Sequence, residues 1–209
     1  MIVNTGVEKM KQIFIFLLAY LVATLWEHYQ HKHILHANNT TVKKWQNSSF
    51  WVHQVLYRGG YYAHHVVHHK LTFQTEYTTQ FDSKEEQEKL DRFLIKKFGK
   101  TDSKQGYGLT INTIYEYIMF LLPAFFLLPI LAFYLDFSQL LIFVLPLTFP
   151  LLLSKYIHPI LHDKLEDKSW VYNNWYVRLI YQTHYIHHQD DGKNFNLLWG
   201  GDWIMGTDA

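Results

Sequence analysis

Cysteine is absent from this sequence of 209 residues. Its absence excludes disulfides, thiolate zinc sites, cysteine-held iron–sulfur clusters and thiol catalysis, and it leaves any metal site to nitrogen and oxygen ligands. An excess of charge of one sign is also missing, since the formal net charge is +1. Without a basic block among aromatic residues, we expect no nucleic acid partner. The sequence is instead rich in aromatic residues and long apolar runs, and it contains fourteen histidines.

Three apolar segments stand out, at about residues 13–27, 114–135 and 138–153. The first is short for a bilayer, which needs about 20 residues. The other two are separated by a few polar residues and predict a helical hairpin, whose four prolines are of the kind tolerated in membrane helices. We therefore predict an all-α protein with one N-terminal membrane span plus a hairpin. The alternatives are buried helices of a soluble bundle and, for the first segment, a cleaved signal peptide.

This arrangement places residues 28–110 and 154–209 on the same side of the membrane. All fourteen histidines and seventeen of the nineteen lysines and arginines lie in these two regions. The positive-inside rule makes that side cytosolic. The sequence thus predicts one domain over 1–209, a multi-pass integral membrane protein with a cytosolic, helical, His-rich metal domain. Its location would be the endoplasmic reticulum in a eukaryote or the inner membrane in a bacterium.

A further amphipathic helix is expected between the histidine clusters and the hairpin. Leu90, Phe93, Leu94 and Phe98 fall on one helical face, and charged residues fall on the other. Such a helix either lies on the membrane surface or packs on the His-rich domain. Glycine pairs at 59–60 and 200–201 predict turns.

The pattern His-x-x-His-His occurs twice, in "HVVHH" and in "HYIHH". Imidazole is the commonest metal ligand in proteins, so repeated spacing of this kind predicts metal binding. On a helix, residues at i, i+3 and i+4 share a face. The histidines that converge in this way are His65, His68 and His69, then His184, His187 and His188, and finally His158 with His162.

The first cluster, "EHYQHKHILH", is harder to interpret. His31 and His36 are five residues apart and diverge on an ideal helix, so they need a helix end or a distortion. His28 with His31, and His33 with His36, fit a regular helix better, and spacing alone leaves these alternatives open. About ten imidazoles exceed the four to six ligands of one ion and suit two metals.

The ordered motifs "HKHILH", "HVVHH" and "HYIHH" around hydrophobic segments resemble the fatty acid hydroxylase superfamily. "WEHYQHKHILH" is similar to the opening motif of fatty acid 2-hydroxylases, and "NFNLLWGGDWIMGT" resembles the closing pattern of the superfamily. The resemblance runs from about Leu25 to Thr207. It implies ten metal ligands: His31, His36, His65, His68, His69, His158, His162, His184, His187 and His188.

The resemblance also implies two non-haem iron ions, with zinc as a substitute in purified protein, together with O2 and an external electron donor. It implies hydroxylation of a lipid taken from the bilayer, most simply a fatty acyl chain. Because no cytochrome b5 domain is part of the sequence, the electrons would come from a separate cytochrome b5- or ferredoxin-like protein. Candidates to orient the imidazoles are Glu27, Asp190, Asp191 and Asn194.

Several alternatives stay open at this point. Within the same superfamily, the chain could be a desaturase or a sterol or carotenoid oxidase. From other classes, it could be a non-catalytic zinc-binding membrane protein or a metal transporter. Four histidines match no ligand position and are expected to be ordinary polar or supporting residues: His28, His33, His53 and His64.

Overall fold

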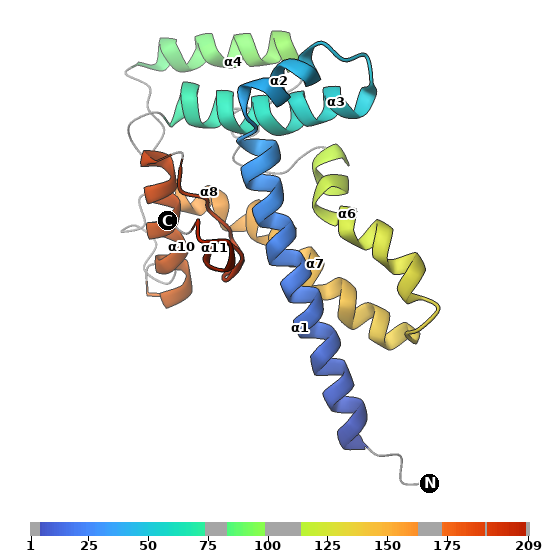
Figure 1. Cartoon of the computed structure of the whole chain (residues 1–209). Coiled ribbons are helices and arrows are strands. Elements are labelled where there is room, and N and C mark those ends of the chain that lie inside the picture. The colour runs from blue at the N-terminus through green and yellow to red at the C-terminus, as the bar shows by residue number, and fades with distance from the viewer. Residues whose placement is uncertain (1–4, 74–82, 99–113, 163–172, 191, 208–209) are drawn as a thin grey trace.

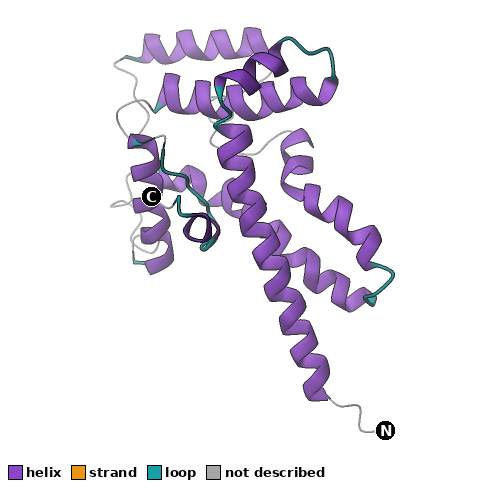
Figure 2. Ribbon diagram, in the orientation of Figure 1, coloured by secondary structure: helices purple, strands orange, loops and turns teal. Residues whose placement is uncertain are grey.

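The computed structural model describes residues 5–73, 83–98, 114–162, 173–190 and 192–207 (Figure 1). The prediction of an all-α protein is confirmed, since the described residues form helices and loops and no strand (Figure 2). The elements are α1 (Thr5–Gln30), η1 (His31–Leu35), α2 (Asn39–Gln46), α3 (Trp51–Val55), η2 (Leu56–Thr72), α4 (Lys84–Phe98), α6 (Ile114–Leu131), α7 (Phe137–Tyr156), α8 (His158–Leu161), α10 (Trp175–Gln189) and α11 (Gly201–Met205).

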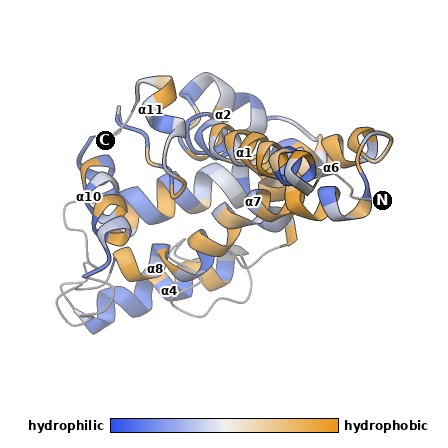
Figure 3. Cartoon of the chain, turned by 90° about the horizontal axis from the view of Figure 1, so that it is seen from below, coloured by the Kyte–Doolittle hydropathy of each residue, from blue (hydrophilic) through white to orange (hydrophobic). Residues whose placement is uncertain are grey.

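Two helices are long and apolar enough to cross a membrane. One is α1, which continues into η1 so that Gly6–Leu35 forms a single 30-residue helix, and the other is α7. The first apolar segment is therefore embedded in a longer helix than its composition indicates. Between them, α6 contributes a shorter apolar helix over Glu116–Leu131. Seen from below, the apolar residues gather on α1, α6 and α7 (Figure 3).

The predicted hairpin of α6 and α7 packs along α1. Ala19 and Ala23 of α1 are buried against Phe143 and Leu147 of α7. Small side chains at these positions let the two helix backbones approach closely. At its start, α7 is capped by Asp136, whose carboxylate accepts a hydrogen bond from the backbone N–H of Gln139 at 2.9 Å.

A layer formed by α2, α3, η2 and α4 crosses the end of α1 that carries η1 (Figure 1). Leu94 of α4 is buried against Val67 and Phe73 of η2, and Leu90 packs beside it. Of the two alternatives for this amphipathic helix, the structure thus shows packing on the His-rich region, with Phe93 left 44% exposed. The side chain of Phe98 lies outside the described residues.

The glycine pair at 59–60 does not form the turn that the sequence predicts, because both residues lie inside η2. Gly60 is needed there for close packing. A Cβ atom at this position would lie 3.0 Å from the Cγ2 atom of Ile34 in η1. This approach sets η1 and η2 side by side, and the two helices carry half of the histidines of the candidate site.

The C-terminal segment returns to α1 and is fixed there by side chains of that helix. Glu27 accepts hydrogen bonds from the backbone N–H groups of Leu197 at 2.7 Å and Leu198 at 3.0 Å. The hydroxyl of Thr24 accepts one from the N–H of Gly201 at 2.9 Å. A Cβ atom on Gly201 would lie 2.5 Å from the carbonyl oxygen of Thr24, so only glycine allows this approach.

Candidate metal centre

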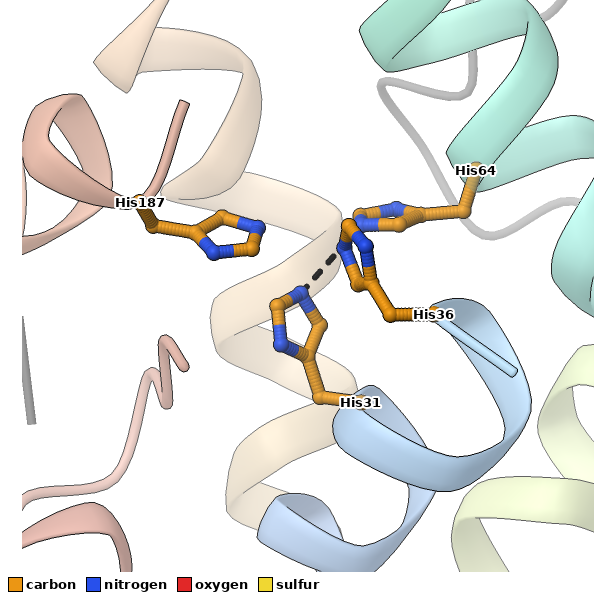
Figure 4. Close-up of side chains that lie close together, drawn as sticks. All are labelled: His31, His36, His64 and His187. Atoms are coloured by element: carbon orange, nitrogen blue, oxygen red, sulfur yellow. Dashed lines mark hydrogen bonds between the residues drawn. The ribbon is translucent and has the colours of Figure 1, made fainter. Parts of the chain in front are cut away.

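Histidines from four helices, η1, η2, α8 and α10, meet where α1 passes into η1. Three groups have ligand nitrogens that all lie within 4.8 Å of one another. They are His31, His36, His64 and His187 (group A), then His68, His158, His162 and His184 (group B), and finally His68, His69 and His188, which we call the linking group. In Figure 4 the four rings of group A point toward one another from η1, η2 and α10.

The local helix geometry explains why histidines five residues apart converge. Both η1 and η2 are π-helical, with a backbone hydrogen bond from the N–H of His36 to the carbonyl of His31 at 3.0 Å. A bond between residues five apart winds the helix more widely than an α-helix. His31 and His36 therefore share a face, which is the distortion that this pair required.

The same π-helical geometry brings His64 of η2, rather than His65, into the cluster. His64 precedes His69 by five residues, and their Nε2 atoms lie 3.2 Å apart. His65 belongs to none of the three groups; its Nδ1 atom lies 3.0 Å from Nδ1 of His36, and its ring stacks on Tyr61. Reading the segment as a regular α-helix favours His65 over His64. The sequence does contain a signal for His64, because the five-residue spacing of His31 and His36 recurs in His64 and His69.

Two hydrogen bonds in group A indicate which ring nitrogen of His31 and of His187 carries the proton and which one presents a lone pair. Nδ1 of His31 lies 2.8 Å from Oδ1 of Asn194, and Nδ1 of His187 lies 2.6 Å from the backbone carbonyl oxygen of Lys193. Both partners are acceptors, so each Nδ1 carries the proton and each Nε2 presents a lone pair. Nε2 of His31 faces Nε2 of His64 at 3.2 Å, drawn as the dashed line in Figure 4.

These distances fit a bound metal ion. Two nitrogens bound to one ion at about 2.1 Å lie about 3.0 Å apart at a right angle and about 3.4 Å apart at the tetrahedral angle. The 3.2 Å between the Nε2 atoms of His31 and His64 lies within that range. Nε2 of His36 is buried and has no hydrogen-bond partner among the described residues. An ion at the centre of group A would satisfy both observations.

Group B is more deeply buried than group A. His68 and His184 are fully buried, and His158 and His162 are at most 6% exposed. Two aromatic rings cover the group: Phe73 lies 4.0 Å from His162 between ring centroids, and Phe195 lies 4.3 Å from His184. Group B is thus a dry, all-imidazole cluster.

The linking group joins the two clusters. The ring of His69 stacks on that of His188 at 4.1 Å, and Nε2 of His69 lies 3.2 Å from Nε2 of His187 in group A. Nε2 of His188 lies 3.2 Å from Nε2 of His184 in group B. The sequence-predicted ligands other than His65 are all brought together in these three groups.

Burial keeps these imidazoles neutral. Loss of hydration lowers the pKa of His36, His64, His69 and His184 well below the ordinary value of 6.5, and neighbouring imidazoles lower it further. The same causes lower the pKa of His188 to about 3. The neutral form is the one that binds metals, so the cluster holds its lone pairs ready at neutral pH.

Of the predicted orienting residues that the structure describes, Asn194 has a hydrogen bond to a histidine of the groups. Its Nδ2 atom donates to Oδ1 of Asp202 at 2.5 Å, which directs its oxygen toward His31. Asp202 also binds Nδ1 of His28 at 2.7 Å. Both residues are buried. His28 takes the kind of supporting position expected of it from the sequence, whereas Asp202 was not predicted. For Asp202, the closing motif "GGDW" was the available signal.

The other predicted residues lie elsewhere. Glu27 holds backbone N–H groups of the C-terminal segment, as described above. Asp190 is exposed and accepts a hydrogen bond from the N–H of Gly192 at 2.8 Å, and Asp191 lies outside the described residues. His33 is exposed, and His53 binds the hydroxyl of Ser48 at 2.8 Å; neither belongs to a group.

A cavity of about 100 Å³ opens directly beside the histidines. Its wall includes His31 and His64 of group A and His158 of group B. The remaining wall is largely apolar and comes from α1, η2, α6, α7 and the C-terminal segment. A small molecule in this cavity would touch both histidine clusters at once.

No protein-family model matches the chain, and no curated protein or solved structure matches it either.

Proposed function

We propose that the chain is a membrane-bound, non-haem di-iron oxidoreductase that hydroxylates a lipid with O2. The observation that supports this most directly is the pair of four-histidine groups sharing one cavity wall. One ion at group A and one at group B would each have imidazole ligands, with His69 and His188 between them. The membrane location is supported by the two helices of sufficient length and apolarity.

The imidazole donors are compatible with iron, and the proposed reaction requires a redox-active metal. Imidazole ligands suit iron, copper and zinc. Bound iron would supply the oxidation of an unactivated C–H bond, which no protein side chain performs. In the balanced reaction, one oxygen atom enters the C–H bond as a hydroxyl group. The other oxygen atom leaves as water, with two protons and two electrons from a separate electron-transfer protein.

The chain's own residues have three tasks in this proposal. The histidines of groups A and B bind through nitrogen lone pairs. Asn194 and the carbonyl of Lys193 hold the rings of His31 and His187 in the required tautomer and orientation. Phe73 and Phe195 cover group B and exclude water from it.

Lipid analysis of cells with and without the chain, grown under ¹⁸O2, tests the proposal. We expect a lipid that gains one labelled hydroxyl group, and we expect the gain to disappear in a His187→Ala variant present at the same membrane level. A new double bond would place the chain among desaturases of the same metal chemistry. Zinc in anaerobically purified protein together with an unchanged lipid profile would refute catalysis and favour the zinc-binding alternative.

A further inference from the structure

Gln30, the last residue of α1, has a buried carboxamide without a hydrogen-bond partner. The residue is 3% exposed, and neither Nε2 nor Oε1 has a partner among the described residues. Buried polar groups of this kind are rare, because water is lost without replacement. Gln30 also forms part of the cavity wall beside the histidines. Its position therefore indicates a partner that the chain itself does not supply.

No other glutamine among the described residues shares this feature. Gln139 is equally buried, but its Nε2 donates to Glu8 at 2.9 Å. Gln54 donates to the carbonyl oxygens of Trp45 and Ser48 at 3.0 and 2.7 Å. The side-chain amides of Gln54 and Gln139 thus have hydrogen-bond partners within the chain, whereas that of Gln30 has none among the described residues.

A second hollow lies along the same two helices, on turns next to those that line the cavity. It is an apolar groove lined by Val22, Leu25 and Trp26 of α1 and by Leu122, Pro123 and Phe126 of α6. The cavity is lined by neighbouring turns of the same helices, which include Gln30 on α1 and Met119 on α6. Cavity and groove therefore follow one another from the histidine level into the apolar part of the helices.

One hydrogen bond joins a residue of the groove wall on α1 to a residue of the cavity wall on α6. The indole Nε1–H of Trp26 donates to the backbone carbonyl of Met119 at 2.9 Å. That carbonyl is available because Pro123, four residues later, has no N–H to bind it within the helix. The bond holds the two helices in register beside both hollows.

We infer that cavity and groove bind one lipid, with its hydrocarbon chain along the groove and a neutral polar group at Gln30. A carboxamide both donates and accepts, so it complements an amide or a hydroxyl group. Glu116 in the cavity wall disfavours an anionic carboxylate. Because Gln30 directly precedes His31, the carbon that reacts under the proposed function lies close to the polar end of this lipid. That last step rests on the proposed function, whereas the binding itself does not.

Equilibrium binding of radiolabelled hexadecanamide to the full chain in detergent tests the inference. In the unmodified chain, we expect unlabelled hexadecanamide to compete better than hexadecane or hexadecanoate. Gln30→Met keeps the size of the side chain and should weaken hexadecanamide binding about threefold to tenfold. Gln46→Met, an exposed position outside both hollows, should leave binding unchanged. Leu122→Trp fills the groove and should weaken every chain-bearing ligand, whereas Leu141→Trp on the exposed face of α7 should not.

Equal competition by hexadecane and hexadecanamide in the unmodified chain would overturn the inference without any variant. Unchanged hexadecanamide binding in Gln30→Met would overturn the role of Gln30, and unchanged binding in Leu122→Trp would overturn the role of the groove. Metal content, measured on the same samples, separates this result from the proposed function. A chain that holds no metal but binds hexadecanamide through Gln30 would refute the oxidoreductase and leave the lipid site standing.

Discussion

Oδ1 of Asn194 lies 2.8 Å from Nδ1 of His31, and the two residues are 163 positions apart in the chain. This contact connects the end of α1 to the C-terminal segment, which Glu27 and Thr24 hold against the same helix. Asp202 completes the network by accepting from Asn194 and binding His28. The last residues of the chain thus set the orientation of one of the first histidines.

Replacement of Asn194 should therefore weaken metal binding without removing a ligand. We expect Asn194→Leu to lower metal affinity about 10–100-fold, because His31 loses the acceptor that fixes its tautomer. Competition with a chelator on purified protein measures this change. Asn47→Leu is the matched control, since Asn47 is exposed at the end of α2 and belongs to none of the three groups. Equal affinity of the two variants would contradict the role of Asn194.

His64 and His65 form a pair of neighbours that separates the π-helical geometry from a regular helix. His64→Ala should lower metal content and activity at least as strongly as loss of an orienting residue, about 10–100-fold. His65→Ala should have a smaller effect, because His65 belongs to none of the three groups and contacts His36 from outside them. Metal analysis and product turnover at matched membrane levels measure both variants. The reverse order of severity would support the α-helical assignment instead.

The sequence predicted the helical class, the three apolar segments and nine of the ten histidines in the groups. Its prediction that His65 converges with His68 and His69 at α-helical spacing was wrong, since His65 belongs to none of the groups. It left the pairing of the first cluster open and assigned His64 a supporting role, because hydropathy and spacing do not distinguish a π-helix from an α-helix. His28 was expected to be a supporting residue, but its partner Asp202 was missed since the two residues are 174 positions apart. Contacts of that range depend on the packed fold and on the close approach at Gly201, which no local pattern reveals.

The buried histidines also predict how stability depends on pH. Because the folded pKa values of His36, His64, His69, His184 and His188 lie below the unfolded value, the unfolded chain binds more protons at acidic pH. The free energy of unfolding should then fall as the pH drops below about 6.5. The Tm of chelator-treated protein between about pH 8 and about pH 5 measures this dependence. A Tm that rises or stays constant on acidification would contradict neutral, buried imidazoles.

The proposed membrane arrangement makes a prediction about sidedness. Tags at Ser83 and at the C-terminus should be accessible from the cytosolic side, because both belong to the region that carries the histidines. A tag at Asp136, in the connection between α6 and α7, should be accessible only from the other side. Protease protection or membrane-impermeant labelling in intact and opened vesicles makes the comparison. A cytosolic tag at Asp136 would mean that the hairpin does not span the membrane.

The central claim is that groups A and B together hold two metal ions. Elemental analysis of the full chain, purified without oxygen, tests it most directly, with His64→Ala and His162→Ala as variants of one group each. We predict about two iron ions per unmodified chain and a loss of about one ion in each variant. One ion or none in the unmodified chain would contradict the two-metal account.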